Sequence, residues 1–120
     1  MGDFTRNFSR HEFACKCGCG YDTADFELII VLQLIADYFD AAVSISSGSR
    51  CYMHNTKVGG GKTSQHLYGR AADITVFGVH PDEVANYLER VYEGKYGIGR
   101  YNSFTHIDTR SWKARWDERD

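Results

Sequence analysis

Two stretches of the sequence place histidine and aspartate next to apolar residues. In SQHLYGRAADITV, His66 closes a glycine-rich loop and Asp73 lies inside an otherwise apolar segment. In SFTHIDT, His106 and Asp108 are two residues apart, so they share one face if the segment is an extended strand. A carboxylate among apolar residues is costly to bury unless it is paired or bound to a cation. These residues are therefore the first candidates for chemistry.

Imidazole and carboxylate groups are ligands of catalytic zinc, which takes three protein ligands and keeps one position for water. His66, Asp73 and His106 are a candidate ligand set of this kind. The alternative from the residue types alone is a buried histidine–aspartate hydrogen-bonded pair that holds no metal. A histidine and an aspartate seven residues apart are a weak signal by themselves, so both interpretations stay open.

The four cysteines form a second group of possible ligands. Cys15, Cys17 and Cys19 lie in CKCGCG, and Cys51 follows much later. The C-x-C-x-C run lacks the spacing that is usual for zinc sites, and its glycines favour a loop. Three states remain open: free thiols, one disulfide between Cys51 and one of the other three, and a structural metal site. Synthesis in the cytosol weakens the disulfide interpretation.

Hydrophobic periodicity predicts two helices and four strands around these residues. The first helix is capped by Thr23 or Asp25 and continues to about Asp40, and the second carries Pro81 in its first turn. Strands are predicted at residues 42–47, 71–77, 96–101 and 103–109. This order predicts an α+β fold, in which a mostly antiparallel sheet has helices packed on one face.

Length, charge and hydropathy limit the classes of protein. A chain of 120 residues fits one domain, 1–120, with an N-terminal segment at 1–22 that holds the cysteine loop and a charged tail at 111–120. The formal net charge of −2 gives no sign of a nucleic-acid partner, although it leaves a locally basic patch open. Met1 is followed by no apolar stretch of a secretory signal, and the longest apolar run, 28–32, is too short to span a membrane. We therefore expect a monomer made in the cytoplasm, without membrane insertion.

Three motifs in order carry a resemblance to a known family. The stretch SQHLYGRAADI resembles the S-x-H-x-x-G-x-A-x-D signature of the zinc D-alanyl-D-alanine carboxypeptidase family, which includes peptidoglycan endopeptidases and phage endolysins and shares its metal fold with the Hedgehog signalling domain. Arg50, in ISSGSRC, lies sixteen residues before His66, as in the family's S-G-x-R element. FTHIDTR is similar to the closing F-x-H-x-D-x-R element of one branch, and FSRHEFACKCGCG resembles that branch's opening.

The resemblance implies a small Hedgehog-like α+β fold with one catalytic Zn²⁺ held by His66, Asp73 and His106. Several relatives have an H-x-H pair on the last strand, and others place an acidic general base three residues before the histidine, where this chain has Ser103. Two arrangements follow. Either His106 binds zinc and Asp108 serves as general base or supports His106, or Asp108 binds zinc and His106 is the base. We favour the first, because imidazole is the commoner zinc ligand.

The resemblance also implies a substrate and a setting. Arg50 is expected to take part in catalysis by pairing its planar guanidinium with a substrate carboxylate, and Ser64 to hydrogen-bond the same end. The implied activity is hydrolysis of peptide bonds in peptidoglycan stem peptides, by a D-Ala-D-Ala carboxypeptidase or a murein endopeptidase. The implied setting is cell wall degradation, as by an endolysin that a holin or a virion delivers. The alternatives are a non-catalytic zinc-containing binding module of the same fold and a chain whose only metal lies in the cysteine loop.

Overall fold

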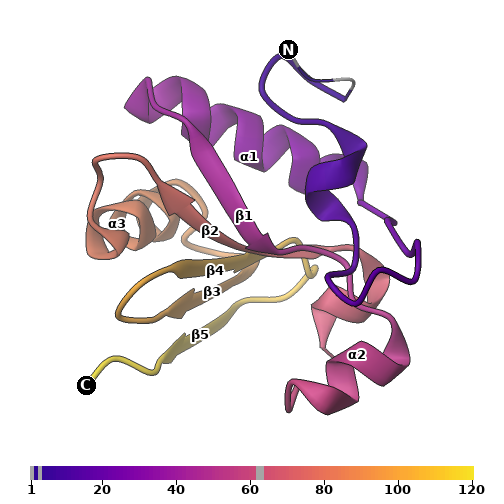
Figure 1. Cartoon of the computed structure of the whole chain (residues 1–120). Helices are drawn as coiled ribbons and strands as arrows, with labels where there is room; N and C mark the ends of the chain where they lie inside the picture. Colours follow the sequence, from indigo (N-terminus) through magenta and orange to yellow (C-terminus); the bar gives the residue numbers. More distant parts are fainter. Residues whose placement is uncertain (1, 3, 62–63) are drawn as a thin grey trace.

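The computed structural model describes residues 2, 4–61 and 64–120, and Figure 1 shows the arrangement of the chain. The helices are α1 (Phe26–Phe39), α2 (Tyr52–Lys57) and α3 (Pro81–Val91), and the two short 3₁₀ turns are η1 (Arg10–Phe13) and η2 (Gln65–Tyr68). The strands are β1 (Val43–Ser47), β2 (Ala71–Val76), β3 (Gly97–Arg100), β4 (Thr105–Asp108) and β5 (Ala114–Asp117). Within the described ranges, no helix has the length and apolar character that crossing a membrane requires.

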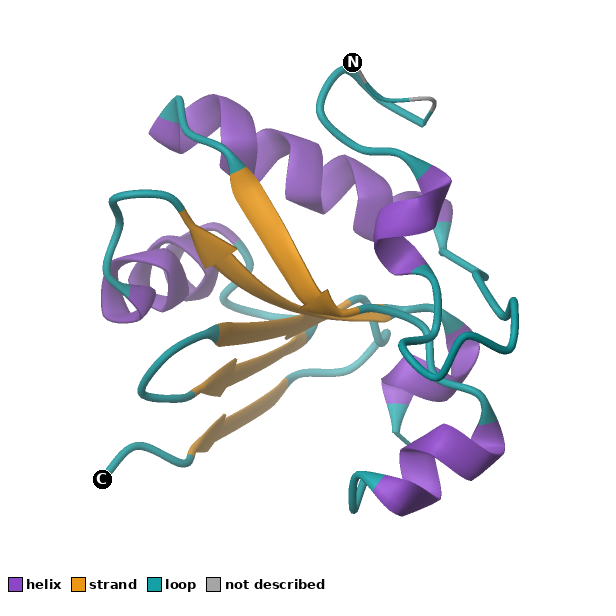
Figure 2. Cartoon of the chain, in the orientation of Figure 1, coloured by secondary structure: helices purple, strands orange, loops and turns teal. Residues whose placement is uncertain are grey.

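The five strands form one sheet in the order β1-β2-β4-β3-β5, which Figure 2 shows as a twisted layer. β1 with β2, β2 with β4, and β4 with β3 are antiparallel pairs, whereas β3 and β5 run parallel. The predicted α+β fold with a mostly antiparallel sheet is therefore confirmed. The short connection between β3 and β4 makes them a hairpin, as the sequence predicts.

Each of the two long helices begins at a side chain that caps it. The Asp25 carboxylate accepts a hydrogen bond from the Leu28 amide at 3.4 Å, so Asp25 is the residue that caps α1. α3 begins with Pro81 after His80, whose Nδ1 accepts a hydrogen bond from the Asp82 amide at 3.1 Å. Proline suits this first helical position because the amide there has no partner within the helix. The caps therefore fix where both helices begin.

The two faces of the sheet have different chemistry. The face toward α1 and α3 is apolar, and its buried side chains join the core that both helices complete: Ala72, Ile74 and Val76 from β2, Ile98 from β3 and Ile107 from β4. Full burial of each large aliphatic side chain contributes roughly 1.5–3 kcal/mol. Because side chains alternate along a strand, Asp73, His106 and Asp108 lie on the opposite face. The core thus holds the strands while the other face carries the polar residues.

Two elements lie where the sequence predicts none. α2 has only six residues, too few for a helical hydrophobic period to be visible. β5 lies within residues 111–120, which we expected only as a charged tail. Its four residues combine two charges with one tryptophan, so they show no strand pattern, and pairing with β3 supplies the order instead.

Asp25 also joins the start of α1 to the residues that follow β4 and η2. Its Oδ2 accepts a hydrogen bond from the Thr109 hydroxyl at 3.1 Å, and its amide donates to the Gly69 carbonyl at 2.8 Å. Asp25→Ala removes the cap and the Thr109 contact, so we expect the free energy of unfolding to fall by about 1–2 kcal/mol. Chemical denaturation measures the change, with the exposed Glu93→Ala as control. An Asp25→Ala variant as stable as the control would contradict this account.

Candidate metal centre

Three side chains from three elements meet on the polar face of the sheet. His66 comes from η2, Asp73 from β2 and His106 from β4. Asp73 and His106 are direct partners in the antiparallel register of β2 and β4, which places their side chains next to each other. One donor atom from each of the three residues lies within 4.8 Å of the other two, and all three residues are buried. The structure thus brings the three predicted ligands together.

The backbone around His66 turns its ring toward Asp73. Ser64 begins η2 by accepting a hydrogen bond from the His66 amide at 3.3 Å, and Gly69 ends η2 in the left-handed region with φ 68°. A β-carbon on Gly69 would lie 2.4 Å from a backbone oxygen, so glycine is required on both grounds. The Gly48 carbonyl lies 2.7 Å from Nδ1 of His66, which leaves Nε2 facing Oδ1 of Asp73 at 3.4 Å.

Both ring nitrogens of His106 face a carboxylate. Nδ1 lies 2.9 Å from Oδ1 of Asp73, and Nε2 lies 2.8 Å from Oδ2 of Asp108. A neutral His106 that donates its Nε2–H to Asp108 presents the Nδ1 lone pair toward Asp73 and His66. Metal-binding histidines are commonly oriented by a carboxylate in this way. Asp108 lies on the side of the His106 ring that faces away from Asp73 and His66. The geometry therefore favours His106, rather than Asp108, as the third ligand.

The donor set and its spacing suit zinc. Two imidazoles and one carboxylate make a three-ligand protein site that leaves a fourth position for water. With ligand bonds of roughly 2.0–2.1 Å, a tetrahedral Zn²⁺ separates neighbouring donor atoms by about 3.3 Å. Oδ1 of Asp73 lies 2.9 Å from Nδ1 of His106 and 3.4 Å from Nε2 of His66. These two separations suit such an ion, and the donor atoms of His66 and His106 lie within 4.8 Å of each other.

Asp108 is fully buried, and donors occupy its carboxylate. Besides His106, the carboxylate accepts hydrogen bonds from the Gly97 amide at 3.1 Å and from Nε and Nη2 of Arg110 at 2.7 and 2.8 Å. The described residues that line the pocket in front of the three ligands do not include Asp108. The assignment of Asp108 as general base stays a prediction, and these surroundings favour a role in holding His106.

Two glycines that support the ligands carry no reactive group, and sequence reasoning missed them. In the β3–β4 register, Gly97 is the partner of Asp108 and Gly99 is the partner of His106. A β-carbon on Gly97 would lie 2.2 Å from Oδ2 of Asp108, and one on Gly99 would lie 2.4 Å from the indole nitrogen of Trp116. The signal in the sequence is the pair of glycines two residues apart in a predicted strand, which marks a close approach of other groups.

The paired charges set the protonation of the group. Burial opposes ionisation of Asp73, yet hydrogen bonds with His106 and His66 hold its pKa well below its usual range. Burial also opposes ionisation of Asp108, and contacts with His106 and Arg110 again lower the pKa. Burial by itself would lower the pKa of His106, but its bonds to the two carboxylates outweigh burial and raise the pKa. A metal ion bound at Nδ1 of His106 therefore competes with a proton, so metal affinity falls as the pH drops through this pKa.

A pocket of about 430 Å³ opens in front of the three ligands. Its wall combines aromatic and polar side chains, among them Tyr101, Phe104, Trp116, Arg50, Ser64 and Arg110. The indole of Trp116 packs at a tilt against the His106 ring, with ring centroids 4.9 Å apart, and donates to the Tyr101 hydroxyl at 2.9 Å. The pocket therefore offers an apolar wall beside the candidate metal position.

Arg50 and Ser64, the two predicted substrate-binding residues, both line this pocket. Nε of Arg50 donates to the Ser47 hydroxyl at 3.1 Å, Nη1 donates to Oδ1 of Asn55 at 3.2 Å, and Nη2 lies 3.5 Å from Oδ2 of Asp73. The guanidinium is thus fixed beside the ligands rather than solvated. The Ser64 hydroxyl caps η2, so its part in substrate binding stays a prediction.

The protonation of His106 gives a direct test of this arrangement. In metal-free protein, we expect the His106 ring to titrate above the ordinary histidine pKa of about 6.5, because two carboxylates stabilise the imidazolium. Asp108→Asn removes one carboxylate and should lower that pKa. Titration of the ring carbon-bound protons by nuclear magnetic resonance measures both effects, with the distant surface substitution Asp40→Asn as control. An unchanged His106 pKa in Asp108→Asn would contradict the assigned contact.

The comparison with known families agrees with the geometry of these residues. A family model described as peptidase M15 matches residues 6–108, which include His66, Asp73, His106 and Asp108. No curated protein sequence matches the chain. The M15 peptidases are zinc-dependent, and the group of His66, Asp73 and His106 is able to hold such an ion. Because the match covers most of its length, the chain belongs to the peptidase M15 family of metallopeptidases.

Proposed function

We propose that this protein is a zinc peptidase that hydrolyses a peptide bond in the stem peptides of peptidoglycan. The observation that carries the proposal is the group of three buried ligands at the base of a pocket whose wall also holds Arg50. Membership of the M15 family supports the metallopeptidase chemistry. The proposed setting is degradation of the cell wall, as by an endolysin, and the proposed form is a monomer.

In this proposal His66, Asp73 and His106 hold one Zn²⁺. A bound zinc ion supplies an acidic water molecule and polarises a carbonyl oxygen. The chain's own residues then fix the reaction geometry. The Gly48 carbonyl keeps Nε2 of His66 directed at Asp73, and Asp108 keeps Nδ1 of His106 directed there. Arg110 and the Gly97 amide hold Asp108 in turn, so each of the two histidine ligands is held by a second contact.

Arg50 is proposed to bind a carboxylate of the substrate. Its side chain is 15% exposed, so an anion in the pocket meets a cation that is partly shielded from water. Hydrogen bonds to Ser47 and Asn55 fix two of its nitrogens and thereby hold the plane of the guanidinium group. A free carboxylate is present in a stem peptide that ends in D-alanine, which fits a carboxypeptidase. An endopeptidase that reads a carboxylate beside the scissile bond fits the same contact.

A second candidate function is a non-catalytic zinc-containing binding module. One observation favours it: among the described residues lining the pocket, Asp73 is the only carboxylate, and it is already a proposed ligand. If Asp108 only holds His106, the general base is unassigned. A peptide-binding pocket without turnover is then the consistent alternative.

A turnover assay separates these two functions. We expect the zinc-loaded protein to cleave purified muropeptides, with loss of a terminal alanine identifying a carboxypeptidase and two peptide fragments identifying an endopeptidase. Mass spectrometry of the products gives the answer. His66→Ala should abolish cleavage because it removes a ligand, whereas His80→Ala, at an exposed helix cap, should not. A folded, zinc-loaded protein that binds muropeptides and leaves them intact would establish the binding module.

The same assay at different zinc concentrations distinguishes the two possible roles of Asp108, as the residue that holds His106 or as the general base. If Asp108 holds His106, Asp108→Asn weakens zinc binding by about 10- to 100-fold, and excess zinc restores cleavage. If Asp108 is the general base, the variant stays inactive with zinc fully bound. The surface substitution Asp40→Asn is the control for both arms.

The proposed contact of Arg50 predicts a defect in substrate binding. Hydrogen bonds to charged groups contribute about 1.5–3 kcal/mol each, so Arg50→Ala should reduce kcat/KM by roughly 10- to 100-fold, chiefly through KM. Arg50→Lys keeps the charge without the planar fork and should recover only part of the loss. Steady-state kinetics measures the effect, with the exposed Arg70→Ala as matched control. An unchanged KM in Arg50→Ala would remove Arg50 from the substrate site.

A further inference from the structure

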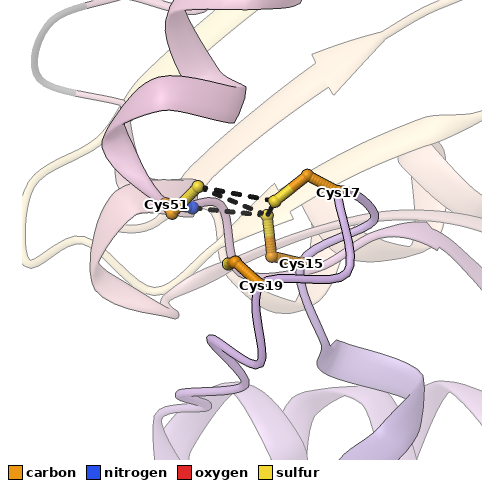
Figure 3. A group of neighbouring side chains, drawn as sticks. All are labelled: Cys15, Cys17, Cys19 and Cys51. Atoms are coloured by element: carbon orange, nitrogen blue, oxygen red, sulfur yellow. Dashed lines mark hydrogen bonds between the residues drawn. The ribbon is translucent and has the colours of Figure 1, made fainter.

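The four cysteines converge at a place that the proposed peptidase site does not use. Cys15, Cys17 and Cys19 belong to one loop. Cys51, the residue directly before α2, faces this loop (Figure 3). The Sγ atom of Cys15 lies 3.5 Å from that of Cys17 and 3.8 Å from that of Cys51, and the remaining Cys17–Cys51 distance is 3.7 Å. Cys19 completes a group whose sulfurs all lie within 4.8 Å of one another.

These distances match a tetrathiolate metal site. Bonded sulfurs of a disulfide are about 2.05 Å apart, and all four thiols are free in the structure. A tetrahedral zinc ion with Zn–S bonds of about 2.3 Å places its sulfur ligands about 3.8 Å apart. The three measured separations, 3.5, 3.7 and 3.8 Å, fall at this value. The sulfurs of Cys15, Cys17 and Cys51 are therefore already spaced as such an ion would require, and the sulfur of Cys19 lies within 4.8 Å of each of them.

The backbone explains how a C-x-C-x-C run forms such a site. Gly18 and Gly20 have φ values of 82° and 92°, a region that other residues rarely adopt. The Gly18 amide donates to the Cys15 carbonyl at 3.2 Å, which closes a tight turn. The run is therefore a folded loop rather than a strand, and its alternate residues turn inward to one point.

Backbone amides also point at the sulfurs. The Cys51 amide donates to Sγ of Cys15 at 3.4 Å, and the His54 amide donates to Sγ of Cys51 at 3.4 Å. Such bonds stabilise negative charge on sulfur, the form in which cysteine binds metals. Cys17 and Cys19 are exposed, so an ion has a path to the group from solvent.

We propose that Cys15, Cys17, Cys19 and Cys51 bind one structural Zn²⁺, in addition to the ion proposed for the peptidase site. Sulfur ligands in a tetrahedral set select zinc among the common divalent cations, whereas Mg²⁺ and Ca²⁺ require oxygen ligands. Binding releases the protons that the thiols carry, and no redox step is involved.

This second ion has a structural task. Residues 48–51 supply the Gly48 carbonyl that orients His66 and the Arg50 side chain that lines the pocket. The same segment meets the N-terminal residues closely, because the Ser49 amide donates to the Phe13 carbonyl at 2.9 Å. An ion shared by the loop at 15–19 and Cys51 would fasten these two segments together. The cysteine site therefore stiffens one edge of the pocket without touching a substrate.

Metal content tests the proposal independently of peptidase activity. We expect protein purified under reducing conditions and supplied with zinc to hold two ions per chain by elemental analysis. The pair Cys17→Ser with Cys19→Ser should hold one ion, and His66→Ala should also hold one. The exposed Lys16→Ala, in the same loop, is the matched control and should hold two. If only the His66→Ala variant loses an ion, the cysteine site is refuted while the peptidase site stands.

Two further measurements, the absorption of cobalt-loaded protein and the reactivity of the thiols, test the cysteine site in protein that keeps all four cysteines. Cobalt-loaded wild type and His66→Ala should both show thiolate-to-cobalt charge-transfer absorption in the near ultraviolet, which histidine and carboxylate ligands do not produce. All four thiols should react with a thiol reagent only after a chelator is added. Immediate reaction of all four in the zinc-loaded protein would mean free thiols and would overturn the proposal. A non-reducing denatured sample that shows fewer than four reactive thiols would mean a disulfide, with the same consequence.

Discussion

The pairing of Asp73 with His106 across β2 and β4 is the contact on which the site depends. The antiparallel register makes them direct neighbours, and the oxygen of one lies 2.9 Å from the ring nitrogen of the other. A one-residue slip in that register would move one of the two side chains to the core face. The register is held by the apolar residues on the other face, such as Ile74 and Ile107, whose burial requires the same alternation. The register of β2 and β4 therefore determines both the packing of the core and the placement of the ligands.

The site also compensates the negative charge of two buried carboxylates. Asp73 and Asp108 are buried carboxylates, and each is surrounded by cationic or neutral donors. Asp108 is matched by the Arg110 fork, so it needs no further cation. Asp73 meets two imidazoles and lies 3.5 Å from Arg50, a looser set that leaves room for an ion. The difference between the two carboxylates lies in their partners rather than in their burial.

Much of this architecture is readable in the sequence, and the remainder has physical reasons for being hidden. The capped helix after Asp25, the strand around Asp73 and the hairpin that ends at Asp108 are predicted because period, caps and breakers agree there. α2 is too short to show a period, and β5 is ordered by its pairing with β3 rather than by its own composition. The convergence of His66, Asp73 and His106 could be predicted as a set, but which side of His106 faces Asp108 depends on ring rotation. The clustering of Cys51 with a loop more than thirty residues earlier depends on tertiary packing, which spacing does not reveal.

The position of Trp116 makes its fluorescence sensitive to changes at the candidate metal centre. Its indole lies 4.9 Å from the ring of His106 and is anchored by a hydrogen bond to Tyr101, so it cannot turn away freely. The emission of an indole responds to the charge beside it, and the charge on His106 changes when a proton leaves or an ion binds. The chain's other tryptophan, Trp112, is 57% exposed and lies farther out in solvent. Intrinsic fluorescence can therefore follow the state of the centre in real time, without a label attached to the protein.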